Sequence, residues 1–496
     1  MNLVEMLGTR AEATPERPAI IEKNRQITYG DLWQRVQGGA RQFRDAGLQK
    51  GDPLLIIHPI SIELYEVLLS AFHAGLVAVL LDPAKGSRFL DDCLAWFPVK
   101  AYFGSPKAHL LRLKSRPLRK LNNHFHSGTW VPFSQAWNPA SSFAEIEPMN
   151  ADDPALVTFT SGSTGFPKGV VRSHGFLLAQ DHTLGKSLAL KEGQIDLITL
   201  PVFLLSNLSH GLTSVIADTD LTKPGNPDIP KISEQIRQHP ITRATASPAF
   251  FDQLPDALLR QFSEIYTGGA PVFTDLLIRL NSLGVKAHAV YGSTEAEPIS
   301  HFNADDLNDD LLNSISNGGG LPAGHPVPGI EVKIIKDHWG KALPQMTTSE
   351  LEALESQVGE ILVSGDHVLK GYLAGRGDEE TKITVDGRIW HRTGDAGRLD
   401  DSGQLWLLGR CLARWKDFYP LQIEAALHVL KPGWKCAFFK GLLIVEENPE
   451  RLGDALNWIP GLNLVQVEKI PMDQRHNAKI DYPSLEAHLA GAKLPG

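Results

Sequence analysis

The segment TFTSGSTGFPKGVV (Thr158–Val171) is dominated by glycine, serine and threonine, and it directly follows the apolar run ALV. Small residues cannot fill a core, yet they come immediately after a stretch with the composition of a buried strand. A flexible surface loop is one interpretation. The other is a loop whose backbone N–H groups and small hydroxyls approach a polyphosphate, since glycine permits close backbone contact.

The residue types in this loop favour the phosphate-binding interpretation. Lys168 would supply positive charge, but it lies between Pro167 and Gly169, so the loop lacks the Gly-Lys-Ser/Thr run of a Walker A motif. The residues that we expect to contact phosphate through backbone or hydroxyl groups are Thr160, Ser161, Gly162, Ser163, Thr164 and Gly165.

The composition of the whole chain narrows the class of protein. Its 496 residues are 42% hydrophobic, enough for several packed domains, and the net charge of -9 disfavours nucleic acid as a partner. The three cysteines, Cys93, Cys411 and Cys436, show no metal-ligand spacing and suit a reducing compartment. We find no signal peptide at the start and no apolar run that could span a membrane, so we expect a soluble cytoplasmic protein.

Strand-like and helix-like segments alternate through the first 330 residues. Residues 52–59 (DPLLIIHP) and 76–83 (LVAVLLDP) have the pattern of buried strands, and residues 61–75 between them that of a helix capped by a serine. The pattern continues with strands at 155–160, 196–201, 213–218 and 286–292, a helix starting near Ser173 and another over 230–238. This order is typical of a parallel sheet with helices on both faces.

The pattern changes near Gly329 to short alternating strands at 331–335, 359–365 and 403–410. Strands at 436–439 and 442–447 and a helix at 484–492 follow, whereas SNGGGLPAG (316–324) is interpreted as a turn. We therefore expect an α/β fold: a large N-terminal domain (1–409) of parallel-rich sheets with flanking helices plus a β-rich subdomain, a hinge (410–413) and a small α+β C-terminal domain (414–496).

Four motifs in order along the chain carry a family resemblance. After the loop at 158–171 come YGSTEAEP (291–298), HRTGDAGRLDDSGQLWLLGR (391–410) and MDQRHNAKIDY (472–482). Together they resemble the adenylate-forming superfamily of acyl-CoA synthetases, peptide-synthetase adenylation domains and luciferases. The resemblance covers essentially the whole chain and implies ATP and Mg²⁺ as cofactors, a small-molecule carboxylic acid as substrate, and a mobile C-terminal domain that acts as a lid.

The resemblance also implies roles for individual residues. Tyr291 would stack on the adenine or simply pack in the core, and Glu295 would ligate Mg²⁺ or remain a solvated carboxylate. Thr294 would contact phosphate, with a helix- or turn-capping hydroxyl as the alternative. Asp395 and Arg410 would bind the ribose, with a surface ion pair as the alternative. The remaining nucleotide-binding residues implied are Gly268, Gly269, Ala270, Gly292 and Ser293.

Lys479 lies in the last of these motifs. Attack of a carboxylate on the α-phosphate brings two anions together, and a lysine placed there would stabilise the charge of the transition state. An exposed lysine without a role is the alternative. The resemblance makes Lys479, Thr294 and Glu295 the expected catalytic residues.

The hinge region departs from the usual family pattern. In GRCLARWKDFYP (409–420), Leu412 replaces the usual acid or lysine, the segment is about four residues short, and no glycine follows Arg410. The sequences of residues 200–224, 325–335 and 475–480, together with this departure in the hinge, resemble the olefin-biosynthesis β-lactone synthetases. The resemblance implies closure of a β-hydroxy acid on itself, and the alternative is an acyl-CoA ligase or a ligase that loads an acyl carrier protein.

The substrate class follows from a missing charge. Amino acid-activating domains place an aspartate after a phenylalanine in this region, whereas Phe203 is followed here by Leu204, so we expect an apolar acyl or hydroxyacyl chain. His210 and His476 are candidate bases for the hydroxyl, with a structural role as the alternative for each. The expected substrate pocket comprises Phe203, Leu204, Leu205, His210 and Phe250, any of which could equally be core residues.

Overall fold

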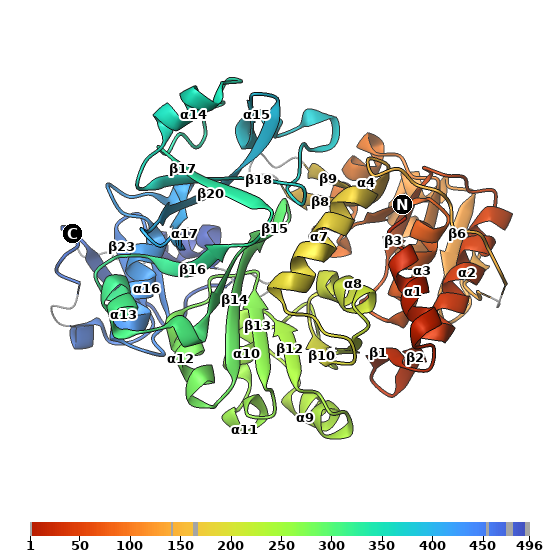
Figure 1. The fold of residues 1–496 in the computed structure, drawn as a ribbon, viewed down its shortest axis with the longest axis horizontal. Helices are drawn as coiled ribbons and strands as arrows, with labels where there is room; N and C mark the ends of the chain where they lie inside the picture. The colour runs from red at the N-terminus through yellow and green to blue at the C-terminus, as the bar shows by residue number, and fades with distance from the viewer. Residues whose placement is uncertain (1, 140–141, 162–166, 453–455, 473–479, 492–496) are drawn as a thin grey trace. The chain divides into compact units, whose positions relative to one another are not determined.

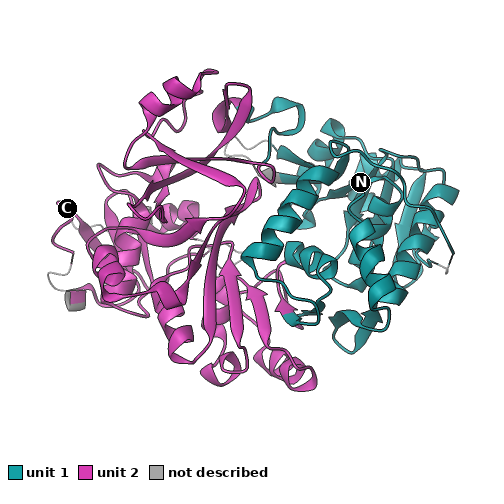
Figure 2. Cartoon of the chain, in the orientation of Figure 1, with its two compact units in different colours: residues 1–196, 201–216, 369–378 teal, residues 197–200, 217–368, 379–496 magenta. Residues whose placement is uncertain are grey.

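The computed structural model describes residues 2–139, 142–161, 167–452, 456–472 and 480–491 (Figure 1). The chain divides into two compact units (Figure 2). Unit 1 comprises residues 1–196, 201–216 and 369–378, and unit 2 comprises 197–200, 217–368 and 379–496. The predicted α/β class is confirmed, and the predicted boundary between a large domain and a C-terminal lid stays a prediction.

A seven-stranded sheet forms the centre of unit 1, with the order β7-β6-β5-β3-β4-β8-β9. Its strands are β3 (Pro53–Ile57), β4 (Val77–Leu80), β5 (Ala101–Gly104), β6 (Asn123–His126), β7 (Gln135–Ala136), β8 (Pro154–Ser161) and β9 (Pro167–Ser173). All neighbours pair in parallel except β8 and β9, which are antiparallel. The strands predicted at 52–59, 76–83 and 155–160 are therefore confirmed.

Helices cover this sheet and a smaller group of strands in the same unit. The helices are α1 (Glu5–Ala13), α2 (Tyr29–Asp45), α3 (Ile62–His73), α4 (Gly86–Trp96), α5 (Leu111–Lys114), α6 (Arg116–Arg119), α7 (His174–Ser187) and α8 (Pro201–Ser209). Strand β1 (Pro18–Glu22) pairs with β2 (Arg25–Thr28) and β11 (Thr213–Ile216). The predicted serine cap at Ser61 is present, because Ser61 Oγ accepts from Leu64 N (3.3 Å). Ser173, near which a helix was predicted to start, is also a cap, since its Oγ accepts from Phe176 N (3.2 Å).

Unit 2 contains a long mixed sheet with the order β17-β18-β20-β21-β16-β15-β14-β13-β12. Its strands are β12 (Arg243–Ala246), β13 (Glu264–Gly268), β14 (Lys286–Ser293), β15 (Ala296–Asn303), β16 (Leu321–Pro326), β17 (Ile330–Ile335), β18 (Gly359–Gly365), β20 (Arg388–Leu399) and β21 (Leu405–Arg410), with β19 (Lys382–Val385) on β20. Strand β10 (Ile195–Ile198) has residues in both units. The parallel part, β12-β13-β14, gives way to antiparallel pairing from β15 onward.

The helices of unit 2 include α9 (Ile229–Gln238), α10 (Pro248–Gln253), α11 (Asp256–Leu259), α12 (Thr274–Ser282), α13 (Asp309–Ser316), α14 (Thr348–Leu354) and α16 (Pro420–Leu430). The C-terminal segment adds a small sheet, β22-β23-β24 (Cys436–Phe439, Leu442–Val445 and Asn463–Gln466), and α17 (Tyr482–Gly491). Helix α16 packs on α12: His428 Nδ1 lies 2.9 Å from Asp275 Oδ2, and the His428 ring stacks on Phe273.

One local interpretation of the sequence was wrong. The glycine-rich segment 316–324 was expected to be a turn, but Leu321–Pro326 forms strand β16, which lies between β15 and β21 in the sheet. Gly324 has φ +79°, and a Cβ there would lie 1.8 Å from the carbonyl oxygen of His301. The glycine therefore allows a close approach of two backbones inside a sheet.

A buried ion pair ties β20 to β18. Arg392 Nε and Nη2 each donate to one oxygen of Glu360 at 2.8 Å, and both side chains are fully buried. A third bond runs from Arg392 Nη1 to the carbonyl oxygen of Lys341 (2.6 Å). Burial raises the pKa of Glu360, while Arg392 opposes that shift. The pairing of β18 with β20 changes register between Glu360 and Leu362, so the bidentate pair joins the two strands across an irregularity that includes residues 393–395.

Every helix in the described part of the chain is too short or too polar to cross a bilayer.

Four buried histidines of unit 1 make its stability depend on pH. Burial is the main cause that lowers the pKa of His73, His109, His124 and His174 to about 4, from an ordinary value of 6.5. Below pH 6.5 these histidines bind protons in the unfolded chain but stay neutral in the folded chain. The stabilisation present at neutral pH is therefore lost as the pH falls towards 4.

We predict that His124→Phe flattens this dependence. Between pH 7.5 and 5.0, its free energy of unfolding should fall by up to about 2 kcal/mol less than that of the wild type. Urea denaturation at the two pH values measures the difference. His325→Gln, at an exposed position in unit 2, is the control and should keep the wild-type pH dependence. Equal pH dependence in His124→Phe and the wild type would contradict the assignment.

Candidate active site

Three of the predicted nucleotide-binding residues meet in unit 2, from the last part of β14, the interior of β20 and the end of β21. Tyr291 Oη donates to Asp395 Oδ2 (2.8 Å) across 104 positions of sequence, and Arg410 Nη1 donates to Asp395 Oδ1 (2.8 Å). Asp395 and Arg410 are also direct partners in the antiparallel pairing of β20 with β21. The Asp395 side chain is 19% exposed and that of Arg410 is 67% exposed.

The electrostatics of this cluster favour donation to Asp395. Burial, followed by the charge of Asp395, raises the pKa of Tyr291 well above its ordinary value, so the phenol stays protonated and donates. The charge of Asp395 is also the main cause that raises the pKa of Arg410. Each carboxylate oxygen accepts one bond from the protein and has a further lone pair. The ion pair considered as an alternative is thus present, and the carboxylate still has capacity for two hydroxyl donors.

The predicted adenine turn lies beside Tyr291. Gly268 ends β13 and pairs with Val290 of β14 in parallel register, so residues 268–270 leave the sheet next to Tyr291. A Cβ on Gly268 would lie 2.5 Å from the carbonyl oxygen of Val290, which explains a glycine at this position. Gly269 is exposed with φ +80°, and Ala270 is half-buried. A flat ring placed on Tyr291 would therefore meet backbone from this turn.

Thr294 and Glu295 occupy the tight connection between β14 and β15. Ser293 pairs with Ala296, and Glu295 N donates to Ser293 Oγ (3.2 Å). The Thr294 side chain is exposed, whereas Gly292, Ser293 and Glu295 are half-buried. The structure thus places the two expected catalytic residues of this motif a few residues beyond Tyr291, at the end of the same strand.

Sequence reasoning did not single out a buried pair near Glu295. Lys382 of β19 and His391 of β20 are register partners, with Lys382 Nζ 3.1 Å from His391 Nδ1. Burial first, and then the charge of Lys382, lowers the pKa of His391 to about 3, and the negative charge of Glu295 opposes this shift. His391 Nδ1 also lies 3.1 Å from the carbonyl oxygen of Thr381, so the ring is held between a lysine and a carbonyl near the expected magnesium ligand. Strand pairing brings them together, and no local signal marks Lys382.

The glycine-rich loop of unit 1 connects two antiparallel strands. Thr160 pairs with Lys168 and Ser161 with Pro167, so β8 and β9 stay paired up to the two residues that flank 162–166. Gly162, Ser163, Thr164 and Gly165 lie outside the described residues. Lys168 Nζ lies 5.7 Å from the centre of the Tyr372 ring, and a Cβ on Gly377 would lie 2.8 Å from this nitrogen. The lysine side chain therefore lies along residues 372–377.

Two other predicted residues, Lys479 and His476, lie outside the described residues, so their roles stay predictions. The predicted hinge is described: β21 ends at Arg410, and Cys411–Ala413 forms a short 3-10 helix in which Leu412 is exposed. The connection then closes tightly, with Trp415 N donating to Phe418 O (2.8 Å) and Phe418 N to Trp415 O (2.9 Å).

The residues predicted to line an acyl pocket come from both units. In unit 1, helix α8 carries Phe203 and Leu204, which are buried, and Leu205, which is half-buried. In unit 2, Phe250 of α10 is fully buried against Phe251. This burial suits either core packing or the wall of a pocket.

His210 follows α8, and its ring is engaged by its neighbours. Its Nδ1 lies 2.9 Å from both Ser206 O and Ser209 Oγ, and Ser209 Oγ also donates to Asp181 (2.6 Å). A Cβ on Gly185 would lie 2.2 Å from His210 Nε2, so the second nitrogen packs against α7. These contacts support the structural alternative for His210.

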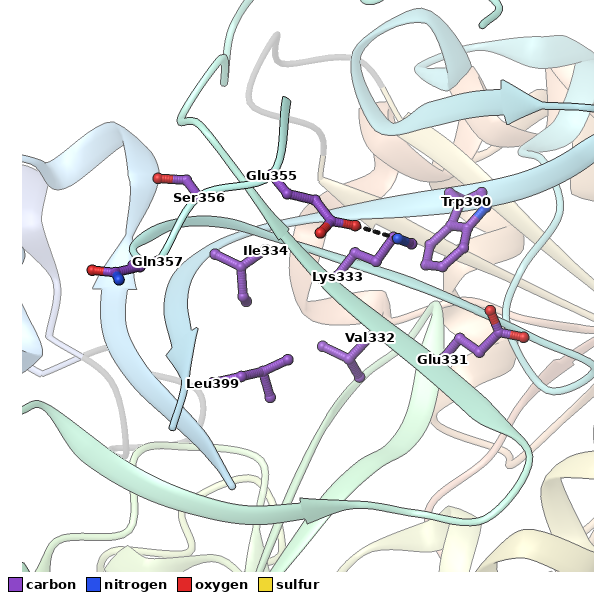
Figure 3. Close-up of a pocket in the computed structure, with 9 residues that line it drawn as sticks. All are labelled: Glu331, Val332, Lys333, Ile334, Glu355, Ser356, Gln357, Trp390 and Leu399. Carbon is purple, nitrogen blue, oxygen red and sulfur yellow. Dashed lines mark hydrogen bonds and ion pairs between the residues drawn. The ribbon is translucent and has the colours of Figure 1, made fainter. Parts of the chain in front are cut away.

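Unit 2 also has a pocket of about 390 Å³ beside β17 (Figure 3). It is lined by Glu331, Val332, Lys333, Ile334, Glu355, Ser356, Gln357, Trp390 and Leu399, and Lys333 and Glu355 form an ion pair across it. None of the predicted site residues lines this pocket.

Comparison with known proteins gives a family match. Residues 7–373 match the model of the AMP-binding enzyme family. The chain is 29% identical to an olefin beta-lactone synthetase of Xanthomonas campestris pv. campestris, over 94% of this chain and 92% of the relative. It is 30% identical to the olefin beta-lactone synthetase of Stenotrophomonas maltophilia, with coverage of 82% and 76%. A putative acyl-CoA ligase of Bacillus subtilis is 27% identical, with coverage of 84% and 82%.

Solved structures share the fold. The anthranilate CoA ligase AuaEII, solved in complex with anthranoyl-AMP, matches with a TM-score of 0.77 at 17% identity and covers 99% of this chain and 98% of its own. The amide bond synthetase McbA of Marinactinospora thermotolerans matches with a TM-score of 0.77 at 19% identity, with coverage of 98% and 99%. With the family match over residues 7–373, these findings lead to one conclusion: the chain belongs to the AMP-binding enzyme family and is an adenylate-forming ligase.

Proposed function

We propose that this enzyme uses ATP and Mg²⁺ to activate a β-hydroxy acid as its acyl-adenylate and then closes the acid to a β-lactone. The observation that carries the second step is the similarity to olefin beta-lactone synthetases over 94% of the chain. The first step rests on the family and on the cluster of Tyr291, Asp395 and Arg410.

The residues of unit 2 fit a nucleoside at this cluster. Asp395 would accept from the two ribose hydroxyls with the lone pairs that Tyr291 and Arg410 leave available. Tyr291 offers a flat face for the adenine, and the turn at 268–270 offers backbone beside it. Charge-assisted bonds to a carboxylate are the strong ones, so we expect Asp395 to dominate binding of the sugar.

The residues also fit a divalent cation held with the phosphates. Magnesium is commonly bound by one or two carboxylates together with substrate phosphates, and Glu295 is a half-buried carboxylate at the end of β14. When bound, the ion would neutralise phosphate charge and orient the triphosphate. Lys382 and His391 form a contact on the neighbouring strands, near enough for the charge of Glu295 to act on the pKa of His391.

In the first half-reaction, a carboxylate oxygen of the substrate bonds to the α-phosphorus and the bond to pyrophosphate breaks. Lys479 would stabilise the charge that builds on the phosphoryl oxygens, and Lys168 would contribute at the phosphate loop. In the second, the substrate's own β-hydroxyl oxygen attacks the acyl carbon, the bond to AMP breaks, and the hydroxyl proton leaves to a base. Because both reacting groups belong to one molecule, proximity assists closure of the strained ring.

The hinge segment supports a reaction without a thiol. Residues 411–419 contain no glycine, and the mutual hydrogen bonds of Trp415 and Phe418 close the segment into a tight turn. Pro420 then starts α16. The segment is thus shorter than the corresponding segment of the usual family pattern, whose glycine helps to form the passage for pantetheine.

A second function, thioester formation with CoA, is favoured by the relatives that carry CoA-ligase names at 26–27% identity. An acyl carrier protein would be the alternative thiol partner. Both alternatives share the first half-reaction and differ only in what attacks the adenylate.

The absence of a carboxylate after Phe203 supports an apolar acid as substrate. Leu204 is fully buried in α8, so no charged group at this position could pair with an α-ammonium. Burying an unpaired ammonium would be costly, which disfavours amino acids.

We predict that Asp395→Ala weakens AMP binding by at least about tenfold, because two charge-assisted hydrogen bonds are lost. Isothermal titration with AMP measures the effect. The matched control is Asp401→Ala, an exposed aspartate in the turn after β20. If both variants bound AMP as the wild type does, the ribose assignment would be wrong.

A second prediction concerns Lys479. Lys479→Ala should lower the rate of pyrophosphate release by about 10²–10³-fold while ATP still binds, because one preorganised charge at the transition state is removed. Pyrophosphate release and ATP titration are measured on the same preparation. A variant that releases pyrophosphate at the wild-type rate would refute the role of this lysine.

The third prediction separates lactonisation from thioester formation. With ATP, Mg²⁺ and a long-chain β-hydroxy acid but no CoA, we expect AMP and a product lighter than the acid by one water, detected by mass spectrometry. The matched control is the same acid without the hydroxyl, which should give the adenylate but no AMP. AMP release that strictly requires CoA or a carrier-bound thiol would replace the β-lactone synthetase assignment with that of a thioester-forming ligase.

A further inference from the structure

Exposed apolar side chains concentrate in one short segment of unit 1. Nine large hydrophobic residues are exposed in the described part of the chain, and four of them lie between residues 110 and 133. They are Leu110 (60% exposed), Leu113 (73%), Trp130 (78%) and Phe133 (90%). Single exposed hydrophobic residues are ordinary, but a concentration of this kind indicates a surface that binds something.

The same segment carries a concentrated positive charge. Between residues 105 and 133 there are six basic residues and no aspartate or glutamate, in a chain whose net charge is -9. The six are Lys107, Arg112, Lys114, Arg116, Arg119 and Lys120, and all except the half-buried Arg112 are exposed. We call residues 107–120 and 130–133 the basic apolar surface.

Hydrogen bonds hold the two parts of this surface together. Arg112 Nη1 in α5 donates to the carbonyl oxygen of Pro132 (3.0 Å), which joins the helical part to the loop that carries Trp130 and Phe133. A second contact fixes the end of this loop to the sheet, because His126 Nδ1 of β6 lies 2.5 Å from Ser134 Oγ. Exposed side chains from two segments of sequence therefore belong to one surface.

The α6 helix directs its charges outward. Its cap, Ser115, accepts from Leu118 N (3.4 Å) and donates to Asp91 of α4 (2.5 Å), and Leu118 is fully buried. With Leu118 anchored in the core and the Asp91 carboxylate engaged by the cap, Arg116 and Arg119 remain exposed. The basic side chains are therefore presented on a firmly packed element.

Phe133 is held in an unfavourable backbone conformation. Its φ is +54°, and it is the only aromatic among the seven non-glycine residues with positive φ that the structure describes. A bulky residue in this region is unusual and costs free energy unless its surroundings hold it. The Phe133 side chain is 90% exposed, so burial within this chain does not offset the cost of the backbone conformation. The exposure indicates that Phe133 contacts another molecule.

We propose that the basic apolar surface docks on the surface of an anionic lipid bilayer. Arginine and lysine would lie at the level of the phosphate headgroups, while Trp130, Phe133 and the two leucines enter the acyl boundary. A folded protein partner would need a matching pocket for each protruding side chain, whereas a bilayer accepts them singly. The proposal is independent of which second step the enzyme performs.

Vesicle co-sedimentation of the full chain tests this proposal. Wild type should bind vesicles containing phosphatidylglycerol far more tightly than vesicles of phosphatidylcholine alone, and raising the salt concentration should weaken the binding. Arg116→Glu with Arg119→Glu should lower the partition coefficient by at least about 20-fold, since each basic residue near an anionic surface contributes roughly fivefold. Trp130→Ser with Phe133→Asn should lower it about tenfold on the same vesicles.

Two controls separate docking from misfolding and from general charge effects. Arg260→Glu and Ile278→Ser, at exposed positions in unit 2, should bind as the wild type does. All variants should keep the wild-type melting temperature and release pyrophosphate normally with a short, water-soluble acid. Asparagine is chosen at position 133 because it tolerates positive φ.

Three results would overturn the proposal. One is equal binding of the wild type to phosphatidylcholine and phosphatidylglycerol vesicles. Another is unchanged binding by both the charge-reversal and the Trp130/Phe133 variants. The third is salt-sensitive binding to an acidic acyl carrier protein that requires Arg116 and Arg119, together with no binding of vesicles by the wild type or any variant. That result would assign the surface to a protein partner.

Discussion

The buried pair of Arg392 and Glu360 is the constraint on which the site in unit 2 depends. Two hydrogen bonds of 2.8 Å between fully buried side chains join β20 to β18 where the register of the two strands shifts, between Glu360 and Leu362. Removal of one partner would leave an uncompensated buried charge, a loss of about 3–5 kcal/mol in comparable pairs. Asp395 lies three residues further along β20, directly after Gly394. Gly394 has φ +73°, and a Cβ added to it would lie 2.9 Å from the Trp339 ring. The ion pair thus anchors the strand that carries Asp395, the carboxylate proposed to bind the ribose.

Charge is distributed around that carboxylate so that each group keeps one protonation state. Tyr291 is held neutral by burial and by the charge of Asp395, and that charge also keeps Arg410 cationic. On the neighbouring strands, Lys382 and burial keep His391 neutral beside Glu295. Tyr291 and Arg410 thus donate to one carboxylate, while Glu295, the proposed magnesium ligand, follows the end of the strand that carries Tyr291. An enzyme that binds a nucleotide and a divalent cation together gains from such fixed charges, because they need no reorganisation when the substrate arrives.

Local pattern predicted much of the fold. The strands at 52–59, 76–83 and 155–160 and the serine-capped helices after Ser61 and Ser173 are present because periodicity and capping act within a few residues. Strand β16 was missed because its glycines serve a close approach to β15 that local sequence cannot reveal. Lys382 and His391 were missed for the same reason, since only the pairing of β19 with β20 brings them together.

The sequence by itself determined the class of chemistry, because the ordered motifs at 158–171, 291–298, 391–410 and 472–482 state which functional groups are available and in what order. It also determined the absence of a charge after Phe203. Only the tertiary structure decided that Tyr291 and Arg410 both bind the same carboxylate, that His210 packs against α7, and that Trp130 and Phe133 share a surface with six basic residues. The physical reason is that hydrogen bonds and ion pairs act over a few ångströms, and pairs such as Tyr291 and Asp395, 104 positions apart, come within that range only when the strands have paired.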